Sequence, residues 1–149
     1  MREILVYTCG NMGETTFDEQ IAWRTKIENL VQKTISGYVI PKVTFIHPPI
    51  YYNYKEKNHK TEREILDWEM MQLHKCDVLV VNFDKINTTT GSHMELGAVN
   101  GINRFGDKYI FVIGFGKTNG VHPWILESCN RIEDTVEDVA SYISNYIAV

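Results

Sequence analysis

The sequence predicts a single α/β domain over residues 1–149, built on a doubly wound and mainly parallel five-stranded sheet. Three observations support this fold class. The 149 residues match the size of one ordinary domain. Hydrophobic residues make up 44% of them, which is enough for a sizeable core. Short apolar runs alternate with segments of helical periodicity, and this alternation is typical of parallel sheets covered by helices.

The first part of the chain contains two predicted strands and one predicted helix. Residues 3–8, EILVYT, are expected to form a buried strand. A Thr-x-x-Glu capping box then begins a helix over about 16–35. The apolar side of that helix carries Ile21, Ile27, Leu30 and Val31. Residues 38–46, YVIPKVTFI, predict a second strand, and Pro41 indicates an edge strand or an irregularity.

The middle of the chain repeats the alternation. Residues 47–60 are expected to form a long loop with three tyrosines, and a helix follows over about 61–75. Residues 77–83, DVLVVNF, are nearly all apolar, as a central parallel strand buried on both faces should be. A helix is predicted over about 91–103, and residues 108–116, KYIFVIGFG, predict another central strand.

The last part, from HPWILESCNRI onward, leads through a short final strand into a helix over about 135–147. The whole arrangement is flavodoxin-like or Rossmann-like. Ligands of such sheets bind beyond the carboxyl ends of the strands. The site is therefore expected to gather three loops, which are TCGNMG (8–13), DKINTTTGSH (84–93) and GFGKTNG (114–120).

Composition argues against several functional classes. The net charge is -4 and Lys and Arg do not cluster, so nucleic acid is not an expected partner. The start MREILVYTCG is expected to be a strand rather than a signal peptide, and no segment approaches the length of a membrane span. Cys9, Cys76 and Cys129 are scattered, which argues against a disulfide framework and fits a reducing cytoplasm. No Cys/His cluster has ligand spacing, so neither a metal site nor a cofactor is expected.

Two glycine-rich segments resemble phosphate-binding motifs and are set aside. The segment GFGKT (114–118) contains the Gly-Lys-Thr of a phosphate loop, but Phe111 stands where that loop needs a glycine. A helix should also follow directly, and Gly120 and Pro123 interrupt it. The segment CGNMG (9–13) is too short for a dinucleotide fingerprint, and no helix begins on it.

Glu95 is a stronger signal, because it stands in a small-residue run where a strand gives way to a helix. It is expected in about the first turn, where the helix dipole and free N–H groups favour an ionised carboxylate. Gly91 allows close backbone approach by a ligand, and Ser92 offers a hydroxyl. Gly97 and Ala98 allow tight packing on the sheet or on a second subunit. The alternative is that Glu95 only stabilises its helix.

Glu69 is a second carboxylate in an unusual place. It falls within the apolar stripe of the predicted helix 61–75, which is formed by Ile65, Leu66, Met70 and Leu73. Burial would raise its pKa, as suits a general acid. The alternative is an edge position that keeps the carboxylate in water. Asp67 is a rival acid on a more polar face of the same helix.

Three motifs together resemble one enzyme family. A Gly/Thr-rich loop is followed by Glu-Leu-Gly-x-Ala, in TTGSHMELGAV (89–99). Glu69 stands eight positions before Asp77, which opens the central strand. The first strand ends in Tyr-x-x-Gly, in YTCGNM (7–12). The sequence thus resembles the nucleoside 2-deoxyribosyltransferase family, including its relatives that hydrolyse 2'-deoxynucleoside 5'-monophosphates.

The resemblance implies an N-glycosyl transferase or hydrolase of nucleotide salvage. Its substrate would be a small-molecule deoxynucleoside or deoxynucleotide, and the sugar would pass to another base or to water. Glu95 would attack the anomeric carbon and form a glycosyl ester. Glu69 would protonate the departing base, although the family usually has Asp at that position. Tyr7 would orient the Glu95 carboxylate.

The resemblance also implies a set of binding residues. Gly10, Asn11 and Met12 would line the base pocket. Asp84, at a strand end, could serve a sugar hydroxyl. Family members bind across subunits, so a homo-oligomer, a dimer or larger, with shared sites is expected. His122 and Trp124 could then complete a neighbour's site, while the alternative for this tryptophan is a core anchor.

One departure concerns the 5' end of the substrate. Six residues before the nucleophile, the transferases tend to carry an Asp that binds the 5'-hydroxyl, and this chain has Thr89. The monophosphate hydrolases also have a hydroxyl residue there. A neutral hydroxyl removes the repulsion that a phosphate would meet, and the helix start behind it suits an anion. However, the segment CGNMGETT (9–16) has no arginine, and Arg24 lies on the following helix. Transferase, hydrolase and a non-catalytic nucleotide-binding module all stay open.

Overall fold

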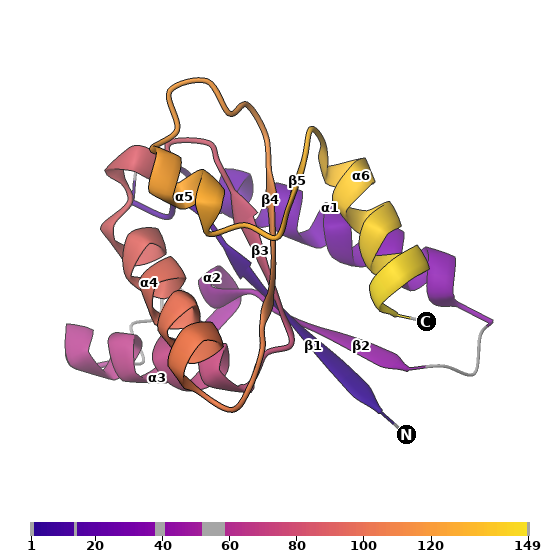
Figure 1. The fold of residues 1–149 in the computed structure, drawn as a ribbon, viewed down its shortest axis with the longest axis horizontal. Helices are drawn as coiled ribbons and strands as arrows, with labels where there is room; N and C mark the ends of the chain where they lie inside the picture. Colours follow the sequence, from indigo (N-terminus) through magenta and orange to yellow (C-terminus); the bar gives the residue numbers. More distant parts are fainter. Residues whose placement is uncertain (1, 14, 38–40, 52–58, 149) are drawn as a thin grey trace.

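A computed structural model describes residues 2–13, 15–37, 41–51 and 59–148, and it confirms the predicted fold class. Five strands form one sheet in the order β2-β1-β3-β4-β5, and every neighbouring pair is parallel (Figure 1). The strands are β1 (Glu3–Cys9), β2 (Lys42–Ile46), β3 (Val78–Asn82), β4 (Phe111–Phe115) and β5 (Arg131–Glu133).

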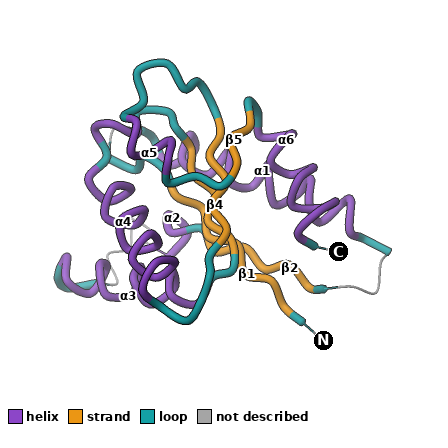
Figure 2. The backbone as a smooth tube through the Cα atoms, viewed as in Figure 1, coloured by secondary structure: helices purple, strands orange, loops and turns teal. Residues whose placement is uncertain are grey.

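Helices cover both faces of the sheet (Figures 1 and 2). Helices α1 and α6 lie side by side over one face, and α3 and α4 lie over the other (Figure 1). The helices are α1 (Phe17–Ile35), α2 (Pro48–Tyr51), α3 (Glu62–Lys75), α4 (Thr90–Phe105), α5 (Pro123–Glu127) and α6 (Val136–Tyr142). A short 3-10 turn, Ile86–Thr88, precedes α4, and a π-helical turn, Ile143–Ile147, follows α6.

Local sequence signals explain where the long helices begin. Thr16 and Glu19 form both hydrogen bonds of the predicted capping box at the start of α1. Thr61 and Glu64 form a second capping box at the start of α3. Helix α4 begins at Thr90 and ends at Phe105, so it is slightly longer than the predicted range 91–103.

Other boundaries differ from the sequence prediction. Strand β2 is an edge strand that begins at Lys42, after Pro41, and residues 38–40 lie outside the described residues. The expected loop 47–60 contains the short helix α2, and its residues 52–58 lie outside the described residues as well. Strand β4 is shorter than expected. Helix α5 was not predicted as a helix, and it forms because Pro123 suits the first helical position.

The core is divided into two layers by the sheet. The layer under α1 and α6 contains Ile27, Val31 and Val139, together with inward-facing residues of the strands. The layer under α3, α4 and α5 contains Leu73 and Leu96. Strands β1 and β3 are central, and the chain leaves β1 toward β2 but returns to β3 on the other side. Because the chain switches direction between β1 and β3, a crevice opens beyond their carboxyl ends.

Candidate active site

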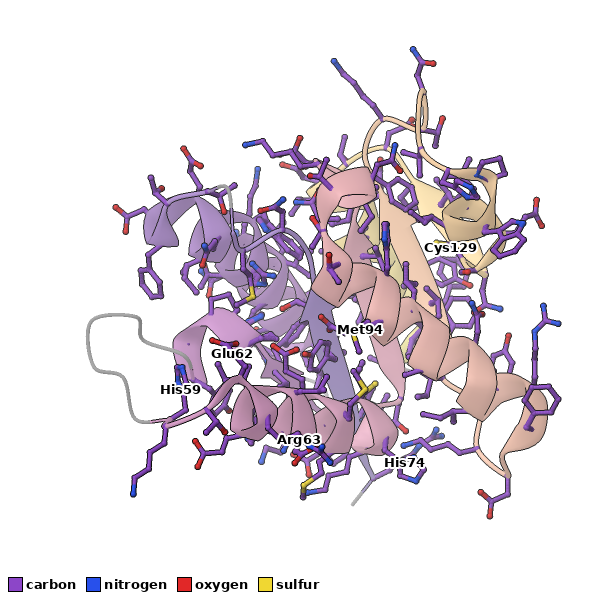
Figure 3. All side chains as sticks on the ribbon, turned by 90° about the vertical axis from the view of Figure 1, so that its left-hand side faces the viewer. His59, Glu62, Arg63, His74, Met94 and Cys129 are labelled. Atoms are coloured by element: carbon purple, nitrogen blue, oxygen red, sulfur yellow. The ribbon has the colours of Figure 1, made fainter. Side chains whose placement is uncertain are left out.

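A cavity of about 460 Å³ lies at this switch point. It is bounded by the loop after β1, by the start of α3, and by the segment that joins β3 to α4. Two of the three predicted loops therefore meet here. The lining residues are Gly10, Asn11, Met12, Gly13, His59, Glu62, Ile65, Glu69, Thr88, Thr89, Thr90, Gly91, Ser92 and Glu95. Figure 3, in which α3 and α4 face the viewer, shows His59 and Glu62 at the beginning of α3.

Glu95 reaches the cavity from the second turn of α4, and only 7% of its surface is exposed. Within the described part of the chain, its Oε2 atom has no hydrogen-bond partner, and neither has Tyr7 Oη or Ser92 Oγ. Tyr7 lies beneath the cavity on β1 and is fully buried. Buried polar atoms are rarely left without partners. Orphaned atoms on a buried acid and on Ser92 beside it indicate a place for a polar ligand.

Burial dominates the ionisation of the two cavity carboxyls. Burial, and after it the charge of Glu69, raises the pKa of Glu95 from 4.5 to about 8. It also raises the pKa of Glu69, from 4.5 to about 7, while the charge of Arg24 lowers it. The expectation that the helix start keeps Glu95 ionised near neutral pH is therefore wrong. Glu95 lies in the second turn of α4 and is almost fully covered, so desolvation outweighs the helix dipole there.

Glu69 occupies the position that its helical spacing predicted. It lines the cavity from α3, and most of its surface is covered. The predicted rise of its pKa is confirmed in direction. Asp67 lies elsewhere on the same helix, where it is exposed and forms an i,i+4 ion pair with Arg63 at 2.9 Å. The geometry brings Glu69 to Glu95 and leaves Asp67 in solvent.

The predicted loop residues are held together by hydrogen bonds. Asn11 Nδ2 donates to Thr89 Oγ1 at 2.9 Å, and Thr89 Oγ1 donates to the carbonyl of Lys85 at 2.9 Å. The first contact ties the loop after β1 to the start of α4. Gly10 is required where it stands, because a Cβ atom there would lie 2.8 Å from Trp23 Cζ2. Gly91 and Ser92 line the same cavity at the first turn of α4.

Three predicted binding residues lie outside this cavity. Asp84 lines a separate cavity of about 480 Å³ together with the loop after β4, so the segment 114–120 does not reach Glu95. His122 and Trp124 line a third cavity, of about 630 Å³, between α4 and α5. Trp124 is 80% exposed and is not a core anchor.

Sequence reasoning missed Glu62 and His59, and it placed Arg24 on the following helix without expecting it behind the site. Arg24 is fully buried beneath the loop after β1. Its position could have been inferred, because Gln20, Arg24, Ile27 and Val31 follow the helical spacing of one face. Glu62 and His59 line the cavity at the beginning of α3, and only the fold brings them to Glu95.

The described residues contain no cluster of three or more His, Cys, Asp or Glu side chains that could hold a metal ion. None of the helices among them is long and apolar enough to cross a membrane.

Comparison with known proteins identifies the family. Residues 3–113 match the model of a family described as nucleoside 2-deoxyribosyltransferase like. No curated protein matches the chain. The matched range covers most of the chain and includes every residue that lines the Glu95 cavity. The chain therefore belongs to the nucleoside 2-deoxyribosyltransferase-like family, and strand β5 and helix α6 lie beyond the matched range.

Proposed function

We propose that this family member cleaves the N-glycosidic bond of a 2'-deoxynucleoside, or of its 5'-monophosphate, through a glycosyl ester on Glu95. The sugar then passes to another base or to water. The observation that carries the proposal is the pair of buried carboxyls, Glu95 and Glu69, in one cavity at the switch point of the sheet. Membership of the family supports this reaction class.

The two carboxyls suit the two roles that the reaction needs. Two acids that interact in a buried site release their protons in separate steps, so near neutral pH one is ionised while the other keeps its proton. The pKa of Glu95, about 8, lies above that of Glu69, about 7, so the remaining proton belongs to Glu95 before the substrate binds. The proposal therefore requires substrate binding to move this proton from Glu95 to Glu69. In the first half-reaction, a carboxylate oxygen of Glu95 bonds to C1' while the bond from C1' to the base nitrogen breaks. The proton of Glu69 goes to the departing base.

The second half-reaction reverses these transfers. A nitrogen of an incoming base, or the oxygen of water, bonds to C1', and the ester bond to Glu95 breaks. The proton of the attacking group returns to Glu69, so both carboxyls recover their starting states. Tyr7 would assist as a hydroxyl donor to Glu95 during these transfers. Burial raises the pKa of the phenol and keeps it protonated, and its hydroxyl has no hydrogen-bond partner among the described residues but is close enough to lower the pKa of Glu95.

Thr89 bears on the 5' end of the substrate. Its hydroxyl is already engaged with Asn11 and with the carbonyl of Lys85. It would therefore contribute a neutral surface rather than a new hydrogen bond, and a neutral surface tolerates a 5'-phosphate as well as a hydroxyl. Both substrate classes are included in the proposal for this reason.

Product analysis tests the proposal directly. A panel of deoxynucleosides and their 5'-monophosphates is incubated with the protein, with and without a second free base. Release of free base alone identifies a hydrolase, and a new deoxynucleoside identifies a transferase. Saturable binding of the panel without base release or exchange would refute the catalytic proposal and would favour a binding module.

Variants assign the roles. Glu95→Gln keeps the size and removes the charge, and base release should fall by several orders of magnitude, the scale expected for a lost covalent nucleophile. Glu69→Gln should cost about 10²–10⁴-fold, as for a lost general acid. Asp67→Asn is the matched control on the same helix and should keep most of the activity, since Asp67 is exposed and paired with Arg63.

A covalent probe identifies the nucleophile. A 2-fluoro-2-deoxy nucleoside should add one sugar mass to the wild-type chain, because its glycosyl ester turns over slowly. Peptide mapping should place the label on Glu95, and the Glu95→Gln variant should take none. A label on any other residue would contradict the assignment of Glu95.

A further inference from the structure

Arg24 is the largest fully buried side chain in the described part of the molecule, and it lies directly behind the candidate site. Three neutral oxygens hold its guanidinium. Its Nε donates to Thr8 Oγ1 at 3.2 Å, its Nη1 donates to the carbonyl of Gln20 at 2.6 Å, and its Nη2 donates to the carbonyl of Gly10 at 3.5 Å. The group also stacks on Trp23, 4.4 Å from the ring centroid. These contacts fix the charge in place.

None of these contacts neutralises the charge. Among the described residues, no carboxylate oxygen lies within 4 Å of an Arg24 nitrogen. A buried charge without a partner is costly, and burial accordingly lowers the pKa of Arg24 to about 10. The side chain nevertheless stays charged at neutral pH, so the compensating negative charge must lie farther away.

Most of the ionisable groups around Arg24 can be excluded as the source of that negative charge. Tyr7 and Cys9 approach from β1, but burial raises the pKa of both and leaves them neutral. His47, beyond Thr8, has a lowered pKa because of its burial, and its ring faces Glu28 at the surface. His59 and Glu62 stand at the cavity lining rather than behind it.

Glu69 on α3 and Glu95 on α4 remain. Both carboxyls line the same cavity as Gly10, and Arg24 donates to the carbonyl of Gly10 from behind that cavity. From this position the charge of Arg24 lowers the pKa of each carboxyl, against the larger effect of burial. We propose that Arg24 is a positioning residue whose fixed buried charge holds the Glu69–Glu95 pair in its singly ionised state. The inference rests on the proposed function only in assigning catalytic work to that pair. The charge relation itself can be measured without any activity.

The direction of the effect follows from electrostatics. A nearby positive charge favours each loss of a proton from the pair, first to the single anion and then to the double anion. Removing the charge of Arg24 therefore raises the pKa of both proton-release steps. The pH range in which one carboxyl is ionised and the other protonated should move upward as a whole. A residue that only supports the backbone of the loop would change the rate without moving that range.

The pH profile of base release gives the first test. Arg24→Met removes the charge and should move both limbs of the profile upward by about one pH unit, the low end for a charge acting on a nearby carboxyl. Arg24→Lys keeps a charge but loses the contact with Gly10, so its limbs should stay within a few tenths of a pH unit of the wild type. If both variants lower the rate and neither moves the limbs, the inference is overturned.

A stability cycle gives the second test and needs no substrate. Wild type, Arg24→Met, Glu95→Gln and the double variant are unfolded with urea at pH 9 and at pH 5. At pH 9, Glu95→Gln should stabilise the Arg24→Met protein more than it stabilises the wild type, by about 1.4 kcal/mol for each pH unit by which the limbs move. At pH 5 the pair is protonated in every background, and the coupling should vanish.

Each outcome decides one question. An energetic coupling between Arg24 and Glu95 that is present at pH 9 and vanishes at pH 5 supports the inference. This holds even if no deoxynucleoside is cleaved and the proposed function fails. If the coupling is equal at both pH values, or absent at both, the inference is overturned, whether or not the protein releases a base. If Arg24→Met does not fold at pH 9, the double variant should recover folded protein, and failure to recover it also overturns the inference.

Discussion

Raising the pH from 6.5 to 9 should destabilise the folded chain, and Glu95 is the main reason. Its pKa rises from 4.5 to about 8 on folding, so the folded state binds more protons than the unfolded state between these values. The stability that protonated Glu95 provides is therefore present at low pH and is lost as the pH rises toward 8. Glu69 acts in the same direction, with a pKa of about 7.

The magnitude follows from the size of that rise. Each pKa unit is worth about 1.4 kcal/mol, so the rise at Glu95 corresponds to about 5 kcal/mol at a pH above both values. About 2 kcal/mol of this falls between pH 6.5 and pH 9. This window avoids most of the opposing contribution of His47, whose lowered pKa makes stability increase with pH at more acid values. A loss of about 2 kcal/mol should lower Tm by about 4–8 °C in a chain of this size.

Urea unfolding of the wild type and of Glu95→Gln across this window measures the effect. The free energy of unfolding should fall with pH in the wild type and fall less in the variant, which should be the more stable protein at pH 9. A variant that loses stability with the same slope as the wild type, or that is less stable at pH 9, would show that Glu95 is not desolvated as its burial indicates.

Three further predictions concern packing, substrate and assembly. Gly114→Ala should destabilise the fold by about 1–3 kcal/mol or more in urea unfolding, because its Cβ would lie 2.2 Å from Phe83 Cζ, and an unchanged midpoint would contradict this. Thr89→Asp should weaken 5'-monophosphates by about 1–3 kcal/mol and spare unphosphorylated deoxynucleosides, measured as kcat/KM, whereas equal losses would mean that Thr89 does not face the 5' position. The chain should form a homo-oligomer through the surface that carries Gly97 and the exposed Trp124, and a fully active monomer in light scattering at micromolar concentration would refute this.

Much of the fold could be predicted from local signals. The Thr16–Glu19 box and the apolar run 77–83 each act within a few residues, and the structure confirms both. The position of Glu69 on the cavity side of its helix also followed from spacing alone. In these places, one short segment is enough to determine its own secondary structure, or the side of the helix on which a residue lies.

The rest depends on contacts between distant segments. The burial of Arg24 is determined by β1 and the loop that follows it, and nothing near Arg24 in the chain specifies that loop. Helix α5 was missed because Pro123 and Gly120 suggested an interruption, whereas Pro123 stands at the first helical position. The pKa of Glu95 was misjudged because its position near a helix start could be inferred from the sequence, whereas the depth of its burial could not.

The packing of α1 against α6 has a consequence for how the protein is made. Helix α6 comes more than a hundred residues after α1 begins, and it covers the core layer that contains Ile27 and Val31 of α1. A ribosome therefore exposes α1, with Arg24 on it, long before its covering helix exists. Until α6 emerges, the helix that supports the floor of the site has an open apolar flank. The complete site should thus form late in synthesis, although every residue that lines the cavity is translated early.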